Sequence, residues 1–195
     1  MLQTDTRQQL IEATGRMILR LGYQKTSVAD IAGEAGLSRA TAYLYFSTKE
    51  AMLSAWLGHR FQQFCRELRE TARAWSDPWQ ALEEALKARI LLRLERASRF
   101  HQNTLHEILA VREAVLSARP EQQAEEARLL EELILRARPG HPGAAQTAHV
   151  LVLATDCLRP SNLSAEQLKD LPALDRQAKQ LCAFLVESLR LGASA

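Results

Sequence analysis

The stretch that most constrains the fold of this chain is residues 26–50, TSVADIAGEAGLSRATAYLYFSTKE. Residues suited to cap a helix N-terminus stand at three points in it: Ser27-x-x-Asp30, Ser38 and Ser47-x-x-Glu50. Gly36 follows the first apolar run, and a glycine commonly ends a helix because it tolerates positive φ. The stretch therefore predicts two short helices, a tight turn between them, and a third helix that begins directly afterwards.

The rest of the sequence also favours helices. It contains long segments rich in Ala, Leu, Glu, Arg and Gln, which are strong helix formers, and no alternating run of β-branched residues that would indicate a strand. Breaks at residues 76–78 and 138–143 separate the helical segments. We therefore expect an all-α chain, with a three-helix helix-turn-helix domain over residues 1–47 and a larger helical domain over residues 48–195.

The helix predicted over residues 39–46 is short, and its outward residues suit the major groove of DNA. Ala42 and Phe46 are one turn apart and can face inward together. Arginine donates to guanine edges, Thr and Tyr hydroxyls bind phosphates, and Ala and Leu contact thymine methyl groups. Sequence reading is therefore expected chiefly from Arg39, Ala40, Thr41 and Leu44. The alternative is that the tyrosines of this helix pack against the body of the protein.

Lys49 stands in the first turn of the next predicted helix, where the positive end of the helix dipole disfavours a cation. A phosphate bound at the same helix N-terminus would reverse that effect. The hydroxyls of Thr26 and Ser27 stand at an earlier helix start in the same way. We therefore expect these three side chains to contact the DNA backbone.

From Gly22 to Glu50 the sequence resembles the DNA-binding domain of the TetR family of bacterial transcriptional regulators. The matching features, in chain order, are Gly22-Tyr23, Thr26-Ser27, Asp30-Ile31-Ala32, Ala35-Gly36-Leu37-Ser38, Thr41, Tyr43, Tyr45-Phe46 and Lys49-Glu50. Two positions depart from the family pattern. Val28 leaves no basic side chain in the first turn of its helix, and Ile18 stands where an aromatic residue is frequent.

The resemblance implies an all-helical homodimer whose larger C-terminal domain regulates and dimerises. It also implies binding to an inverted-repeat operator in double-stranded DNA, with repression relieved by a small-molecule effector, which we expect to be apolar or aromatic. The DNA contacts expected from the resemblance and from residue chemistry together are Thr26, Ser27, Ser38, Arg39, Ala40, Thr41, Tyr43, Leu44, Tyr45 and Lys49.

The last two predicted helices, near residues 144–158 and 172–191, differ from the others. The final one is apolar over most of its circumference and must be covered on two sides, while the other presents mostly small residues along one face. Two such helices from each protomer would form a four-helix bundle at a two-fold interface. The candidate interface residues are Ala148, Val152, Thr155, Leu174, Ala178, Leu181, Leu185 and Leu189. The alternative is that both are interior helices of one large monomer.

A small-molecule pocket is expected against the long helix after residue 48, because aromatic residues with a few polar partners gather in the helices that follow. The candidate lining residues are Phe61, Phe64, Cys65, Leu68, Leu86, Arg89, Ile90, Phe100, His101, Thr104, Leu105 and Ile108. The bland alternative is that the same aromatic side chains form the core. If the pocket exists, a ligand that tilts the long helix would change the separation of two recognition helices.

Other functions find little support in the sequence. The net charge is only +2, so DNA binding is inferred from the motif and not from composition. No nucleophile-elbow, P-loop or dinucleotide-binding pattern is present, so we expect no enzyme and no cofactor. The three cysteines and five histidines lack metal-ligand spacing, so we expect no metal. The polar N-terminus and short apolar runs predict a cytoplasmic protein without a membrane span.

Two alternatives to a ligand-responsive repressor stay open at this point. One is a constitutive DNA-binding protein without a ligand. The other is a helical small-molecule carrier or enzyme whose N-terminal helices are incidental.

Overall fold

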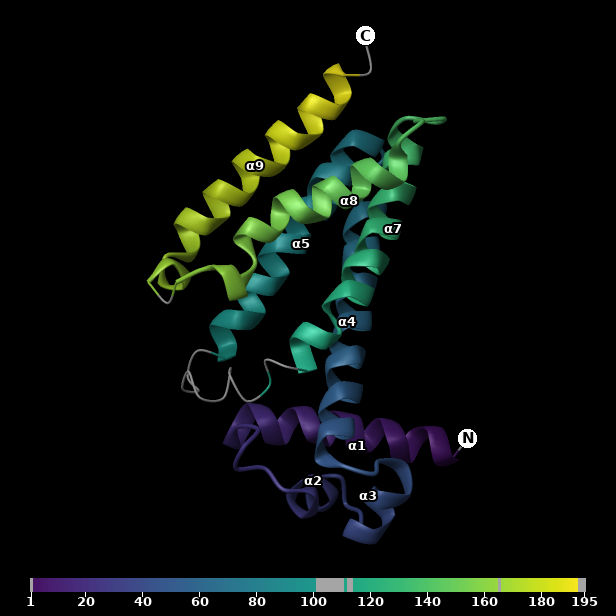
Figure 1. Ribbon diagram of the computed structural model, residues 1–195, viewed down its shortest axis with the longest axis vertical. Coiled ribbons are helices and arrows are strands. Elements are labelled where there is room, and N and C mark those ends of the chain that lie inside the picture. The colour runs from purple at the N-terminus through teal and green to yellow at the C-terminus, as the bar shows by residue number, and fades with distance from the viewer. Residues whose placement is uncertain (1, 101–110, 112–113, 165, 193–195) are drawn as a thin grey trace. The chain divides into compact units, whose positions relative to one another are not determined.

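The computed structural model describes residues 2–100, 111, 114–164 and 166–192 of the chain. These residues form helices and connecting segments and contain no strand, which confirms the all-α prediction. The α-helices are α1 (Leu2–Leu21), α2 (Val28–Glu34), α3 (Arg39–Tyr45), α4 (Lys49–Arg73), α5 (Pro78–Phe100), α7 (Arg119–Ala137), α8 (Ala144–Thr155) and α9 (Leu171–Leu191) (Figure 1). Short 3-10 helices over 156–158, 160–162 and 167–169 connect α8 to α9.

The chain divides into two compact units. The first contains residues 1–63 and 100–119, and the second contains residues 64–99 and 120–195. Helix α4 therefore contributes residues to both units. The boundary predicted after residue 47 falls in the short connection between α3 and α4, and it stays a prediction.

The first unit is built on α1, with α2 and α3 lying on one side of it (Figure 1). Its core is formed by the apolar faces of α1, α2, α3 and α4. The largest core side chains include Leu10, Met17, Ile18, Ile31, Phe46, Met52 and Trp56. Ala42 and Phe46 are buried, as predicted from their spacing on α3. A short and otherwise exposed helix is thus fixed to the unit by one side.

The turn between α2 and α3 has the geometry that its glycine predicts. Gly36 takes φ +70°, a conformation that L side chains rarely adopt. The Leu37 N–H then donates to the Ala32 carbonyl at 2.8 Å, and the Leu37 side chain packs against the core of the first unit. The turn therefore closes over an apolar plug, which sets the angle between α2 and α3.

Gly15, in the middle of α1, is a glycine for a steric reason that the sequence did not reveal. A Cβ atom at this position would lie 2.2 Å from the Trp56 Nε1 of α4, well inside van der Waals contact. The indole therefore packs directly on the backbone of α1. The glycine, which by helix propensity is a weak residue in a helix interior, is what allows α1 and α4 to approach this closely.

The second unit is a helical bundle of α5, α7, α8, α9 and the C-terminal part of α4. Pro78 is the first residue of α5, at the end of the predicted break, and Asp170 caps α9 by accepting from the Ala173 N–H at 3.0 Å. In Figure 1, α8 and α9 lie next to each other. None of the described helices combines the length and apolar character needed to cross a membrane.

Gly15→Ala should lower the free energy of unfolding by about 1–3 kcal/mol, because a methyl group would overpack the Trp56 contact. Helix propensity alone would have the opposite sign, a gain of about 1 kcal/mol. Gly33→Ala on α2 is the matched control, since no atom lies within 4 Å of the corresponding methyl position. Urea unfolding measures both; equal stability of the two variants would contradict the steric account.

Candidate nucleic-acid interface

Side chains at the N-termini of α2 and α3 hold the helix-turn-helix in shape. The Ser27 Oγ accepts from the Asp30 N–H at 3.2 Å, and the Asp30 carboxylate accepts from the Ser27 N–H at 2.9 Å, which is the predicted capping box. The Ser27 hydroxyl also donates to the Asp30 carboxylate at 2.6 Å, and this bond, followed by the one from the Ser27 N–H, holds the pKa of the Asp30 carboxyl below its usual value. The Ser38 Oγ accepts from the Thr41 N–H at 3.0 Å. Caps of this kind typically stabilise a helix by about 1 kcal/mol each.

The third predicted cap was wrong by one residue. Helix α4 begins at Lys49, and its first turn is capped by Thr48, whose Oγ1 accepts from the Ala51 N–H at 3.1 Å. Ser47 lies exposed in the connection before it. Both residues have a hydroxyl on Cβ, so the sequence pattern alone did not distinguish them.

The outer face of α3 carries most of the predicted major-groove residues together. Leu44 is 83% exposed and Tyr43 43% exposed, and Arg39 and Ala40 are exposed beside them. The Arg39 guanidinium lies 5.5 Å from the centre of the Tyr43 ring, and its Nη2 is 3.4 Å from the Tyr43 hydroxyl oxygen. The aromatic ring thus holds the guanidinium over the surface of α3.

Three other predicted contacts lie nearer the protein interior. Thr41 and Tyr45 are half-buried, and Tyr45 packs against the core of the first unit. Thr26 is buried, and its hydroxyl donates to the Gly22 carbonyl at 2.7 Å. The predicted contact between the Thr26 hydroxyl and a phosphate is therefore wrong, because this hydroxyl closes the turn after α1.

Lys49 has partners within the protein, which the sequence did not predict. Its ammonium donates to the carbonyls of Tyr23 and Thr26 at 3.1 Å each, and it lies 4.3 Å from the centre of the Tyr23 ring. These contacts compensate for the unfavourable position of a cation at the start of α4. An ammonium has three N–H groups, so one is left for a phosphate, and that contact stays a prediction.

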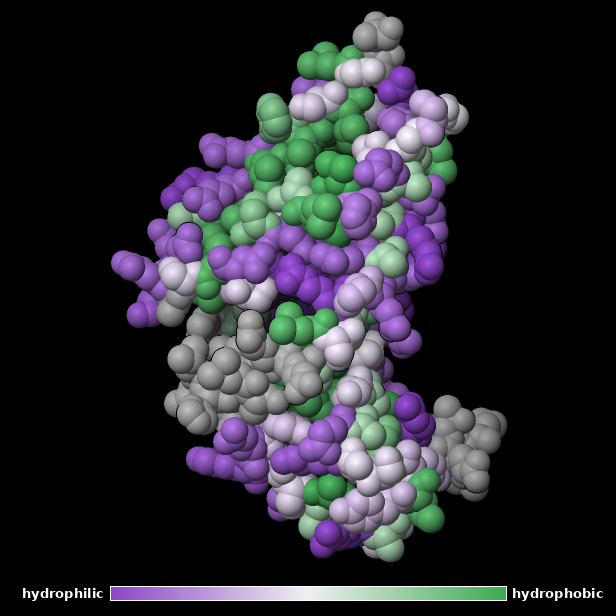
Figure 2. Space-filling view, in the orientation of Figure 1, coloured by the Kyte–Doolittle hydropathy of each residue, from purple (hydrophilic) through white to green (hydrophobic). Residues whose placement is uncertain are grey.

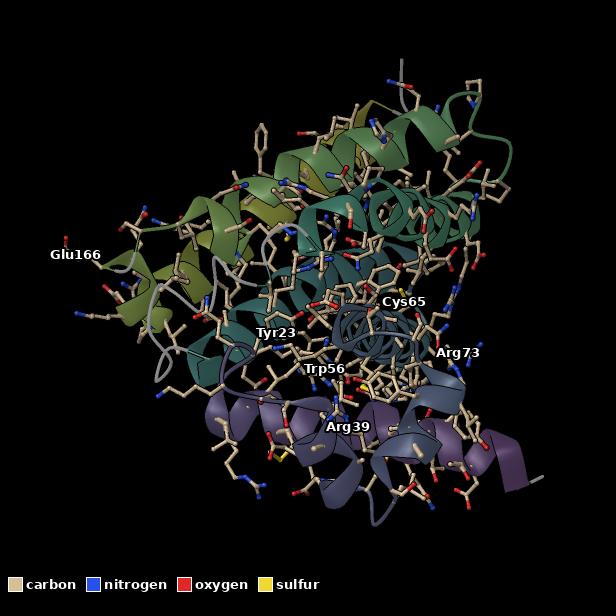
Figure 3. The ribbon with its side chains drawn as sticks, turned by 60° about the horizontal axis from the view of Figure 1, so that its bottom comes forward. Tyr23, Arg39, Trp56, Cys65, Arg73 and Glu166 are labelled. Carbon is tan, nitrogen blue, oxygen red and sulfur yellow. The ribbon has the colours of Figure 1, made fainter. Side chains whose placement is uncertain are left out.

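Tyr23 is the residue that sequence reasoning missed in this region, and Figure 3 labels it with Arg39 and Trp56. Its hydroxyl donates to the Glu50 carboxylate at 2.9 Å. Burial, followed by this contact with Glu50, raises the pKa of the Tyr23 phenol to about 12. Tyr23, Lys49 and Glu50 therefore tie the start of α4 to the turn between α1 and α2. The only hint in the sequence was that all three belong to the family-like pattern.

Comparison with known proteins agrees with this geometry. Residues 10–56 match the family model described as bacterial regulatory proteins, tetR family. The chain belongs to the TetR family. An uncharacterized HTH-type transcriptional regulator of Haemophilus influenzae is 28% identical over 93 residues, which is 42% of this chain and 50% of that protein. The fatty acid metabolism regulator protein of Bacillus subtilis is 36% identical over 62 residues, which is 32% of each chain.

A solved TetR transcription regulator from Haloarcula marismortui has the same fold as this TetR-family chain. The two share 20% identity with a TM-score of 0.68, over 95% of this chain and 98% of the other. The curated relatives, by contrast, are matched over half of their length or less. The family model and the Haemophilus influenzae relative are described as transcription regulators, which agrees with the prediction that this chain is not an enzyme.

Only some of the residues predicted to line a ligand pocket lie in the part of the chain that the structure describes. Phe64, Cys65, Leu68, Leu86 and Ile90 are buried in the second unit, which is expected of a core as well as of a pocket wall. Burial raises the pKa of the Cys65 thiol to about 11, so the thiol is protonated at neutral pH. Phe61 is half-buried in the first unit, and the side chains of Phe100, His101, Thr104, Leu105 and Ile108 lie outside the described residues. The pocket stays a prediction.

Arg89 has a different role from the one predicted. It is 1% exposed, and each of its three nitrogens donates a hydrogen bond: Nε to Glu126 at 2.6 Å, Nη1 to Thr155 at 2.5 Å and Nη2 to Asp156 at 2.7 Å. The second carboxylate oxygen of Glu126 accepts from Arg93. With its donors engaged in this network, Arg89 joins α5, α7 and the end of α8 and is not a free partner for a ligand.

Several predicted interface residues face the interior of the protomer. Ala148, Val152, Thr155, Leu174 and Ala178 are 3% exposed or less, so they cannot contact a partner while this packing is kept. The Thr155 hydroxyl donates to the Leu151 carbonyl of its own helix at 2.6 Å. The residue spacing identified apolar faces on α8 and α9. The prediction, however, placed at the dimer interface the faces that are buried within the protomer.

The exposed apolar residues of these helices lie on other faces. Val150 and Leu153 on α8 are 49% and 51% exposed, and Phe184 and Leu191 on α9 are 70% and 64% exposed. The predicted Leu181, Leu185 and Leu189 are half-buried on α9. Figure 2 shows apolar surface over α8 and α9. We call Val150, Leu153, Phe184 and Leu191 the α8/α9 apolar surface.

Lys49→Met should lower the free energy of unfolding by about 1–3 kcal/mol in the absence of DNA, because it removes two charge-assisted hydrogen bonds and a cation–π contact. Lys25→Met, at an exposed position in the turn between α1 and α2, should leave stability within about 0.5 kcal/mol. Urea unfolding distinguishes the two. An unchanged Lys49→Met protein would mean that the ammonium is not needed for the fold.

Glu126→Gln should lower the free energy of unfolding by about 3–5 kcal/mol, because it leaves the buried Arg89 guanidinium and the partly buried Arg93 guanidinium without their shared carboxylate. Burial already lowers the pKa of Arg93 to about 10, which still leaves that side chain charged at neutral pH. The neighbouring Glu125→Gln is the control, since Glu125 pairs with Arg69 at 3.0 Å on the surface, where such a pair contributes about 0–1 kcal/mol. Similar losses in both variants would contradict the burial argument.

Proposed function

We propose that this chain is a sequence-specific DNA-binding transcriptional regulator that binds an inverted-repeat operator as a homodimer and acts as a repressor. The observation that carries the proposal is the outer face of α3, where Arg39, Tyr43 and Leu44 stand exposed on a helix anchored from behind by Ala42 and Phe46. Such a helix has side chains for base edges on one side and a rigid support on the other. Family membership supports the same conclusion.

Dimerisation follows from the limited length of α3. A helix of seven residues reaches few base pairs, so specificity requires a second copy related by a two-fold axis. The α8/α9 apolar surface is suited to that contact, because four large apolar side chains stand exposed on two adjacent helices. Leu181, Leu185 and Leu189 lie on the same helix as Phe184 and would lose their remaining exposure there.

The proposed effector is an apolar or aromatic small molecule. The buried residues of α4 and α5 that support it are Phe64, Cys65, Leu68, Leu86 and Ile90. The Bacillus subtilis relative is named a fatty acid metabolism regulator, and an acyl chain is one apolar molecule of this class. An effector would relieve repression by favouring a geometry of α4 that does not fit the operator.

Selection from a library of random DNA duplexes tests the DNA-binding proposal without knowledge of the operator. We expect enrichment of an inverted repeat whose half-sites are centred about one helical turn, or a multiple of it, apart. Binding should weaken steeply as salt rises. A folded dimer that enriches no sequence would refute the regulator proposal.

Phe184→Glu should convert the dimer to a monomer, because it places two charges at the centre of the proposed interface. The monomer should lose the operator complex in a gel shift while keeping its helical circular dichroism. Leu135→Glu is the matched control, since Leu135 is also exposed, at 39%, but lies on α7. Sedimentation velocity gives the oligomeric state, and a Phe184→Glu dimer would place the interface elsewhere.

A further inference from the structure

The outward surface of α3 consists of two rows of side chains with different chemistry. Arg39 and Tyr43 are one turn apart and form the polar row, in which the guanidinium is held over the ring. Ala40 and Leu44 are also one turn apart and form a second row, which is entirely apolar. Since Ala42 anchors the opposite side of the helix, both rows face away from the core.

Leu44 is more exposed than Tyr43, the large side chain next to it on this surface. At 83% it has the highest exposed fraction among the large apolar residues of the described structure, and it is not among the residues packed against the core of the first unit. Its helix neighbour Ala40 is small, so the backbone of α3 can approach a partner closely along this row. An apolar row on a surface that is otherwise suited to DNA requires an apolar feature of DNA.

The major groove offers one apolar group, the 5-methyl group of thymine. We propose that the Ala40–Leu44 row reads the methyl group of one thymine in each operator half-site, with Leu44 as the residue that requires thymine at that position. This inference rests on the proposed DNA-binding function and adds a specificity determinant to it. It also separates the two rows: the Arg39–Tyr43 row contacts polar atoms, while the Ala40–Leu44 row depends on a single methyl group.

Uracil substitution tests the proposal because uracil differs from thymine only by that methyl group. A duplex obtained by selection with the full-length protein is prepared with uracil at each thymine of the half-site in turn. At one position the dissociation constant should rise about 4-fold for one half-site and roughly 15-fold when both half-sites are changed, as expected for loss of one buried methyl group per site. The other positions should show little change.

Leu44→Ala assigns the effect to its residue. This variant should bind the thymine duplex more weakly than the wild-type protein, and the uracil substitution that weakens wild-type binding should have no further effect on it. Because Leu44 is so exposed, its thermal unfolding should match that of the wild-type protein. Leu21→Ala, an exposed leucine of the same unit, is the control and should keep both the affinity and the response to uracil.

The outcomes that overturn the proposal differ from those that overturn the function. If the protein selects an operator but no uracil substitution weakens binding, thymine methyl reading is refuted. If Leu44→Ala keeps the full response to uracil, or binds the operator as well as the wild-type protein does, Leu44 does not read a thymine methyl group and the proposal is refuted. If no duplex is selected at all, the regulator function itself fails.

Discussion

The contact between Trp56 and Gly15 is the constraint on which the first unit depends. An indole that packs directly on a helix backbone fixes α4 against α1 at a distance that no larger residue at position 15 would allow. The core of the first unit then assembles around α1, and α3 is held to it by the buried Ala42 and Phe46 and by the half-buried Tyr45. Trp56, Ala42 and Phe46 belong to one core, so the position of the outer face of α3 depends on how that core packs.

Charged and polar side chains also join the helices and turns within each unit. Lys49, Tyr23 and Glu50 join the start of α4 to the turn after α1, and Thr26 closes that turn from within. In the second unit Arg89 and Glu126 do the equivalent for α5, α7 and the end of α8. Helix α4 contributes residues to both units.

Much of the fold could be predicted from local sequence signals, and the tertiary partners could not. Ser27, Ser38 and Gly36 act within a few residues of their own position, so their patterns specify caps and a turn wherever the helices pack. Arg89 was predicted as a ligand partner because it is a polar residue among aromatic ones. Its actual partners, Glu126 and Asp156, could not be found from the sequence because they are distant along the chain. Spacing likewise identified the apolar stripes of α8 and α9 but could not decide which stripe the same chain covers.

The central claim is that two copies of α3 insert into the major groove on one face of a duplex. Dimethyl sulfate interference on a selected operator tests this most directly, because it modifies guanine N7 in the major groove and adenine N3 in the minor groove. The account predicts interference at guanine N7 in two clusters centred about one helical turn apart. Interference confined to adenine N3, or a single cluster of modified guanines, would contradict it.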